Sequence, residues 1–188
     1  MIKRVMVSAV CVFLLLLVPL PLFAQKPQLP IARTGNEPSL SLGATEAMPD
    51  TEATIPVLYF PKKGEPVPLS TKLHVCLPEQ NITFLKVAVG MAGEAGKAEA
   101  KAEKTAKKGD QCAGLDVQAT LKAPPIDGTL LQLVFKVDKQ APVDTSIPME
   151  GTFEIAGSAG EKVEGKLGAG ELKIVGTMPV FSCFFYMH

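Results

Sequence analysis

Tryptophan is absent from the 188-residue sequence, and only two tyrosines accompany nine phenylalanines. Trp and Tyr combine a broad apolar ring with a polar group, and binding sites for sugars commonly use them to stack their ligands. A carbohydrate-binding β-sandwich module is therefore an alternative interpretation of this chain, and the weaker one.

An excess of charge of either sign is also absent, because 19 lysines and arginines balance 19 aspartates and glutamates. Proteins that bind nucleic acids usually carry a basic patch or a high isoelectric point. The even balance indicates neither a nucleic-acid backbone nor an anionic membrane surface as the partner.

Motifs of catalysis and cofactor binding are missing as well. The sequence contains no G-x-S-x-G, no H-E-x-x-H and no glycine-rich phosphate loop that leads into a helix. His74 could act as a base, but no partner motif accompanies it, so we interpret it as a surface histidine at the rim. Asp127 precedes Gly128 and is typical of a turn. We therefore predict that the protein is not an enzyme and needs no cofactor.

The only long hydrophobic run lies at the N-terminus. Lys3 and Arg4 precede an almost wholly apolar stretch over residues 5–22, which two prolines interrupt before the small residue Ala24. This order is typical of a signal peptide. We predict that residues 1–24 are removed, that the mature chain begins near Gln25, and that the protein is periplasmic, cell-surface or extracellular. A retained membrane anchor is the alternative, because about 20 apolar residues span a bilayer.

Cysteine is scarce, with four residues in all. Cys11 lies in the apolar N-terminal run, which leaves Cys76, Cys112 and Cys183 for the mature chain. Export to an oxidising compartment favours a disulfide. Cys76 and Cys112 both lie inside the predicted domain, so we predict that they pair and that Cys183 is a free or intermolecular thiol. The cysteine spacing matches no zinc pattern and neither histidine clusters with the cysteines, which indicates no metal site.

The rest of the chain divides by composition. Residues 25–53 carry scattered Pro, Ser and Thr without a sustained apolar period, which predicts a disordered tether. Residues 54–176 are the predicted domain, and residues 177–188 form an apolar aromatic tail. One interpretation packs the tail against the domain, and another adds it to a sheet edge of another protein, where Cys183 could form an intermolecular bridge. Membrane contact or an atypical terminus is the remaining alternative.

Short segments of strand-like composition recur through the predicted domain, between turns rich in Gly and Pro. They cover residues 55–60, 69–77, 82–89, 115–121, 131–138, 149–155, 162–167 and 171–175. Pro56 restricts the first of them to a sheet edge or the start of a strand. The clearest alternation runs from Leu131 to Val137 and predicts a half-buried strand. We predict an all-β fold, an antiparallel, jelly-roll-like β-sandwich of about eight or nine strands.

One segment, residues 98–108, carries two conflicting signals. It is rich in Ala, Glu and Lys, which are strong helix formers. It also alternates Ala with charged residues at a strand's period of two. A short isolated helix is marginal in water, so we favour a strand that pairs with residues 112–121 across a turn at 108–110.

Three stretches of the sequence resemble a known family. Pro124–Val137 (PPIDGTLLQLVFKV) and Ala141–Ile147 (APVDTSI) are similar to motifs of bacterial cohesin domains, and residues 82–97 resemble an upstream passage of that family. The resemblance covers roughly residues 65–176. It implies a jelly-roll-like sandwich of about nine strands without catalytic activity.

The resemblance also carries a functional expectation. Well-known cohesins bind calcium-loaded dockerin modules through one sheet face, which implies a partner that is dockerin-like or belongs to an envelope assembly. We expect a non-catalytic, exported protein-interaction module that binds another envelope or extracellular protein. No family binding motif matches this chain residue by residue, so its binding residues stay unassigned. Separately, Asn81-Ile82-Thr83 matches the N-glycosylation sequon, whose use depends on the organism.

Overall fold

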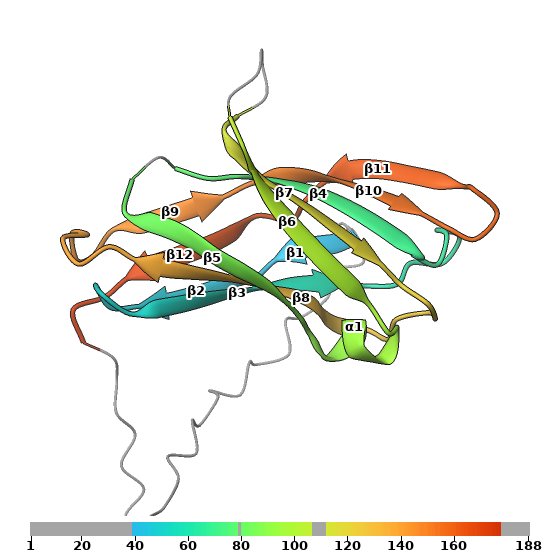
Figure 1. Cartoon of the computed structure of the whole chain (residues 1–188), viewed down its shortest axis with the longest axis horizontal. Coiled ribbons are helices and arrows are strands. Elements are labelled where there is room, and N and C mark those ends of the chain that lie inside the picture. The colour runs from blue at the N-terminus through green and yellow to red at the C-terminus, as the bar shows by residue number, and fades with distance from the viewer. Residues whose placement is uncertain (1–38, 79, 107–111, 178–188) are drawn as a thin grey trace, which may run out of the picture. The chain divides into compact units, whose positions relative to one another are not determined.

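The computed structural model describes residues 39–78, 80–106 and 112–177 (Figure 1). These residues form twelve strands and one short helix. The elements, in chain order, are β1 (Leu40–Leu42), β2 (Ala44–Ala47), β3 (Glu52–Tyr59), β4 (Ser70–Cys76), β5 (Ile82–Val89), α1 (Met91–Ala95), β6 (Glu99–Thr105), β7 (Gly114–Thr120), β8 (Gly128–Val137), β9 (Ser146–Met149), β10 (Gly151–Ala156), β11 (Lys162–Lys166) and β12 (Gly170–Ile174). No helix among them is long and apolar enough to cross a membrane.

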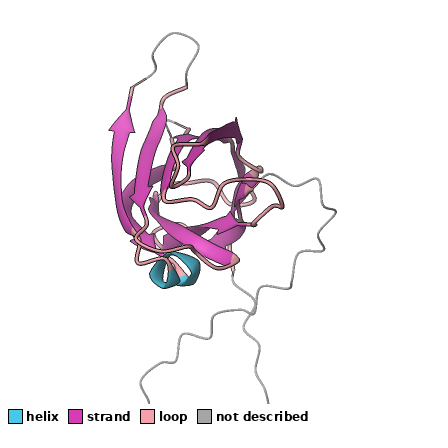
Figure 2. Cartoon of the chain, turned by 90° about the vertical axis from the view of Figure 1, so that its right-hand side faces the viewer, coloured by secondary structure: helices cyan, strands magenta, loops and turns pink. Residues whose placement is uncertain are grey.

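The strands form three sheets around one apolar core. The orders are β1-β3-β8-β5, β11-β10-β4-β7-β6 and β2-β12-β9, and every pairing is antiparallel except that of β2 with β12. In the end-on view of Figure 2 the strands surround the interior, and α1 lies against the outside. The predicted all-β antiparallel sandwich is confirmed, with more strands than expected because short strands at the N-terminal end and around residue 150 add to it.

Strand β8 has no exposed residue. The predicted alternation is present, since Leu131, Leu133, Phe135 and Val137 are fully buried. The strand is not half-buried, however, because Leu130 on its other face is covered as well. A Cβ built on Gly93 of α1 would lie 2.4 Å from the carbonyl oxygen of Leu130. The missing side chain at residue 93 therefore allows α1 to approach β8 closely and cover that face.

The predicted tether over residues 25–53 is wrong for its C-terminal part. β1 pairs with β3, and β2 pairs in parallel with β12 near the end of the domain. Leu40 and Ala47 are fully buried. The domain therefore begins by residue 39 or 40, not at residue 54. Strands of three and four residues are too short to show a period of two, and their partners lie elsewhere in the sequence.

Pro56 occupies a position that was only partly predicted. β3 is not an edge strand throughout, because it lies between β1 and β8 over Val57–Tyr59. The carbonyl oxygen of Pro56 accepts a hydrogen bond from the Gly43 nitrogen, where the chain leaves β1 for β2. Proline has no N–H to donate. It is tolerated here because ladder pairing with β1 stops at the next residue.

The conflict over residues 98–108 is resolved as a strand. β6 pairs antiparallel with β7, which places Ala100 opposite Ala119 and Ala102 opposite Val117. Ala100 and Ala102 pack partly buried against the core, while the charged residues that alternate with them, Glu99, Lys101 and Glu103, are exposed. Pairing with the backbone of β7 thus outweighs the helix propensity of this segment and makes it a strand. The predicted turn at 108–110 lies outside the described residues.

Candidate functional site

Two rows of side chains cross the outer face of the five-stranded sheet. Cross-strand register sets their order, because residues directly opposite one another on neighbouring strands share a face. The first row is Glu164, Glu154, Lys72, Gln118 and Lys101, and the second is Lys166, Thr152, His74, Asp116 and Glu103. The residues between the two rows on the central strands, which are Leu73, Val117 and Phe153, are buried in the core. We call these ten residues the polar sheet face.

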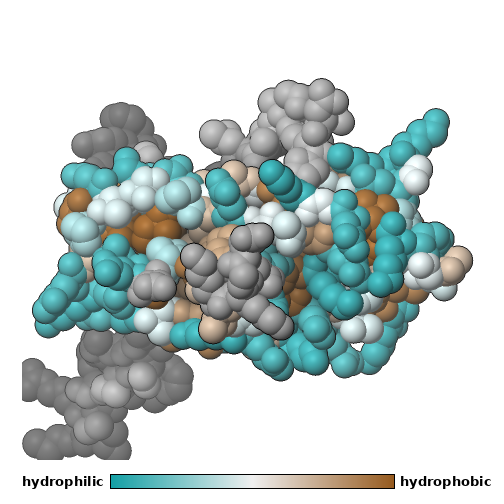
Figure 3. All heavy atoms as spheres, turned by 90° about the horizontal axis from the view of Figure 1, so that it is seen from above, coloured by the Kyte–Doolittle hydropathy of each residue, from teal (hydrophilic) through white to brown (hydrophobic). Residues whose placement is uncertain are grey.

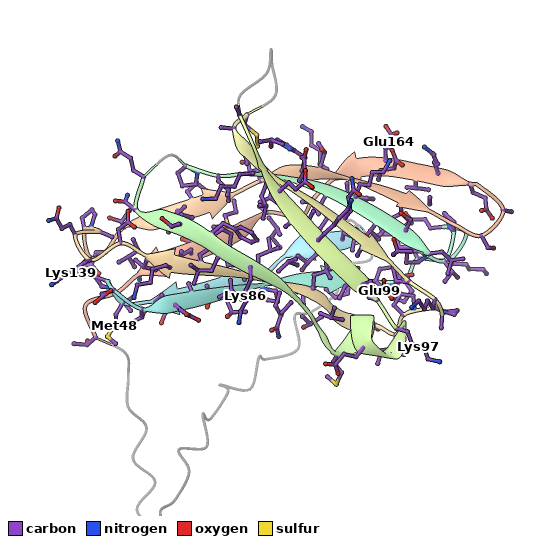
Figure 4. All side chains as sticks on the ribbon, viewed as in Figure 1. Met48, Lys86, Lys97, Glu99, Lys139 and Glu164 are labelled. Carbon is purple, nitrogen blue, oxygen red and sulfur yellow. A yellow bond between two sulfur atoms is a disulfide. The ribbon has the colours of Figure 1, made fainter. Side chains whose placement is uncertain are left out.

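A shallow groove of about 650 Å³ runs over this face. Most of the second row lines it, together with Lys72, Gln118, Glu154 and Glu164 of the first row. Figure 4 shows Glu164 on β11 at the upper margin of the domain. Figure 3 looks down on this side, which is mainly hydrophilic with separate apolar patches. Each strand-borne side chain is anchored by a paired backbone, so the groove presents its polar groups in a preset order.

Ion pairs organise the centre of the groove. The Nζ atoms of Lys72 and Lys162 each lie 3.2 Å from Oε1 of Glu154. The hydrogen bond that Lys72 donates, followed by that from Lys162, holds the pKa of Glu154 below its ordinary value. Pairs as exposed as these contribute little to stability. They place Lys72 and Glu154, which both line the groove, in contact with each other, while Lys162 lies outside its lining.

The predicted disulfide closes one end of this sheet. Cys76, the last residue of β4, is bonded to Cys112, and their Cα atoms lie 5.6 Å apart. Residue 112 precedes β7, which begins at Gly114 opposite Cys76. The bond therefore joins the last paired residue of β4 to the segment that leads into β7. Cys183 lies outside the described residues.

His74 differs from its prediction. We expected a surface or rim histidine because the sequence holds no partner motif, but its side chain is only 11% exposed and contacts two residues. Nδ1 lies 2.6 Å from Oδ1 of Asp116. Nε2 lies 3.2 Å from the carbonyl oxygen of Cys112 and 3.3 Å from its Sγ. The expectation that no histidine clusters with the cysteines is therefore wrong for His74, because sheet register brings together residues that are about 40 positions apart in the sequence.

His74, Cys76 and Cys112 also form a cluster of residue types that can bind a metal ion. Ligand atoms of His74, Cys76 and Cys112 all lie within 4.8 Å of one another. Thiolate, not disulfide sulfur, is the form in which cysteine binds metals. While the disulfide is intact, the cluster offers the imidazole alone, and the absence of a metal site stays a prediction.

The remaining residues singled out in the sequence lie elsewhere. Asp127 is exposed in the turn before β8, where Gly128 has a φ of 132°. Burial, reinforced by the charges of Glu65 and Asp127, raises the pKa of Tyr59 above its ordinary value. Asn81 has a φ of 74° and precedes β5. None of these residues lines the groove on the polar sheet face.

Comparison with known proteins identifies the fold. No protein-family model matches the sequence, and no curated protein matches it. The sixth cohesin of scaffoldin B from Acetivibrio cellulolyticus, solved with a dockerin, has a TM-score of 0.58 at 14% identity and covers 72% of this chain and 97% of its own. A type I cohesin–dockerin complex from Clostridium thermocellum gives a TM-score of 0.57 at 18% identity, over 73% of this chain and 98% of the other.

A third similar structure is a cohesin module that belongs to a glycoside hydrolase. The cohesin module of a family 33 glycoside hydrolase from Clostridium perfringens has a TM-score of 0.55 at 10% identity and covers 73% of this chain and 96% of its own. Near-complete coverage of all three modules shows that this chain contains a cohesin-like β-sandwich domain. At these identities the likeness shows the fold, which agrees with the predicted all-β sandwich.

Proposed function

We propose that this domain is a non-catalytic, exported protein-interaction module whose polar sheet face binds a dockerin-like module of another envelope or extracellular protein. Support for a protein partner comes from the fold, since two of the similar cohesins were solved in complex with dockerins. Fold likeness alone does not identify a function. The choice of binding surface therefore rests on the side chains that this chain exposes.

The groove on the polar sheet face is the observation that carries the choice of surface. It draws its lining from four strands, β4, β7, β10 and β11, and brings positive and negative side chains together. Lys72 and Lys166 lie in it beside Glu154 and Glu164. A mixed pattern of this kind selects a partner with the complementary pattern and rejects one with uniform charge. Strand-borne groups also lose little freedom on binding, which lowers the cost of association.

The exported location is part of the proposal. The basic and apolar order of residues 1–24 supports a signal peptide. The Cys76–Cys112 disulfide supports an oxidising compartment, because such bonds rarely persist in the cytosol of most organisms. Expression in the native host followed by N-terminal sequencing tests this point. The expected mature terminus is Gln25, and an intact Met1 on the membrane-bound protein would favour the retained anchor.

Site-specific photo-crosslinking in the native host tests the proposed surface. A photoreactive amino acid replaces Gln118 or Thr152 on the polar sheet face, and in a matched control it replaces Lys86 of β5 on the other sheet. All three positions are exposed. We expect the first two to give the same crosslinked exported protein and the control to give none. Crosslinks from the control position alone, or none from any position, would overturn the proposed surface.

A second measurement separates the proposal from its alternative. The crosslinked partner is purified and titrated into the protein by calorimetry, beside a panel of soluble polysaccharides. We expect heat from the protein partner only. Saturable binding of a polysaccharide without binding of the protein would favour the carbohydrate-binding interpretation.

A further inference from the structure

The disulfide at the end of the polar sheet face has an unusual environment. Sγ of Cys112 lies 3.3 Å from Nε2 of His74, and Nδ1 of the same ring lies 2.6 Å from Oδ1 of Asp116. Sulfur, imidazole and carboxylate therefore follow one another in a line of contacts. The order is that of an activated nucleophile, in which a carboxylate orients the imidazole that acts on sulfur. Here the sulfur is already oxidised to a disulfide.

The groups that face the two ring nitrogens of His74 determine which form of the imidazole can donate a hydrogen bond to both of them. Nδ1 faces a carboxylate, which accepts when it is ionised. Nε2 faces a carbonyl oxygen and a disulfide sulfur, which are also acceptors. A neutral imidazole carries one N–H and can serve only one side. The imidazolium form donates on both sides and places a positive charge beside Cys112.

The two sulfurs are therefore not equivalent. His74 contacts Sγ of Cys112 and, among the described residues, makes no hydrogen bond to Sγ of Cys76. In thiol–disulfide exchange the better-stabilised thiolate is the better leaving group. An adjacent imidazolium stabilises a thiolate. The geometry thus selects Cys112 as the leaving sulfur and Cys76 as the sulfur that is attacked.

We propose that the Cys76–Cys112 disulfide is an exchange-active redox centre that accepts two electrons from a dithiol. One thiolate of the dithiol attacks Sγ of Cys76, the S–S bond breaks, and its electron pair leaves with Cys112 as a thiolate beside the His74 imidazolium. The second thiolate of the dithiol then attacks the mixed disulfide and releases Cys76. The dithiol becomes a disulfide and gives up two protons, of which one goes to Cys76 and one to solvent.

The position of the centre connects it to the groove. His74 and Asp116 both line the groove on the polar sheet face. Other charged groups surround the ring in the sheet register, with Lys72 on the same strand, Glu103 beyond Asp116 and Lys166 beyond Thr152. Reduction replaces a neutral disulfide by a thiolate at one end of this surface. The exchange reaction itself does not depend on the proposed docking partner.

Alkylation of the reduced full-length protein tests the proposal within one molecule. The protein is reduced with dithiothreitol, freed of reductant, and pulsed with iodoacetamide over a range of pH. Peptide mapping then assigns the label separately to Cys76, Cys112, Cys11 and Cys183. We expect Cys112 to react at lower pH than Cys76, which serves as the internal control. Identical pH profiles for the two cysteines would overturn the proposal.

Variants show whether His74 causes the difference. We expect His74→Gln to remove the difference in pH profile and to slow reduction by dithiothreitol about tenfold. Asp116→Asn should have the same effect in a smaller degree. Lys86→Gln on the exposed side of β5, outside the groove and without contact to sulfur, should change neither measurement. Circular dichroism checks that each variant is folded. An unchanged reduction rate in folded His74→Gln would show that the disulfide is only a structural cross-link.

Discussion

The two large sheets differ in how far their outer faces are covered. β8, in the four-stranded sheet, is buried on both sides because α1 covers Leu130, whereas β4 and β7 bury one face and leave the other open beneath the groove. The second face of the covered strand includes the buried Leu130 and Val134, whereas the open strands carry charged or polar residues on theirs. A sheet face that carries polar side chains and is not covered by another element is available for a partner. The comparison fits our proposal that the covered sheet chiefly stabilises the domain and that the open sheet binds the partner.

The largest expected effect comes from the covered strand. Phe135→Ala removes a fully buried ring that meets Phe84 edge to face, at 5.7 Å between ring centroids. We expect it to lower the free energy of unfolding by about 3–5 kcal/mol. Gln118→Ala on the open strand β7 should change it by less than about 0.5 kcal/mol. Urea denaturation followed by circular dichroism measures both, and equal losses would contradict the division of roles.

The disulfide should have the next largest effect. Replacing both Cys76 and Cys112 by Ser removes a cross-link with a sequence separation of 36. We expect a loss of about 2–4 kcal/mol, because the unfolded chain regains the freedom that the bond removes. Cys183→Ser is the matched control and should leave the urea midpoint unchanged. A midpoint shift in the control equal to that of the double variant would show that Cys183 takes part in the cross-link.

The close approach of α1 to β8 gives a smaller effect. Gly93→Ala adds a Cβ that would lie 2.4 Å from the carbonyl oxygen of Leu130, so the helix has to move away from the strand. We expect a loss of about 1–3 kcal/mol in thermal or urea unfolding. Glu94→Ala changes the next residue, which is exposed, and should have little effect. Equal stability of both variants would mean that α1 does not need to cover β8.

The smallest expected effect lies in the groove. Lys72→Met removes the first of the two lysines that hold the pKa of Glu154 below its ordinary value. We expect that pKa to rise, as followed by NMR titration of the Glu154 carboxyl carbon. Because the depressed pKa belongs to the folded state, the interaction acts at neutral pH and is lost as pH falls through the folded pKa. A pKa that stays fixed in Lys72→Met would show that Lys162 alone sets it.

Much of the core could be predicted from the sequence. The alternation from Leu131 to Val137 sets the buried face of β8, and the alternation over Glu99–Thr105 indicates a strand against its helix propensity. Both signals are local and long enough to show their period. β1 and β2 could not be found in this way, because three or four residues carry no period and their pairing depends on distant strands.

The candidate site was less accessible to sequence analysis. The Cys76–Cys112 pairing could be predicted because few cysteines were available, but the contact of His74 with Asp116 and Cys112 could not. That contact depends on the register of β4 against β7, which places His74 opposite Asp116. No motif links these residues in the sequence. Only a correct prediction of the register between β4 and β7 would have brought His74 and Asp116 together.

Amide NMR of the protein, titrated with the partner captured by crosslinking, tests the assignment of recognition to the polar sheet face most directly. We predict shift changes confined to β4, β7, β10 and β11, with β3, β5 and β8 unchanged. Changes centred on β3, β5 or β8 would contradict the account.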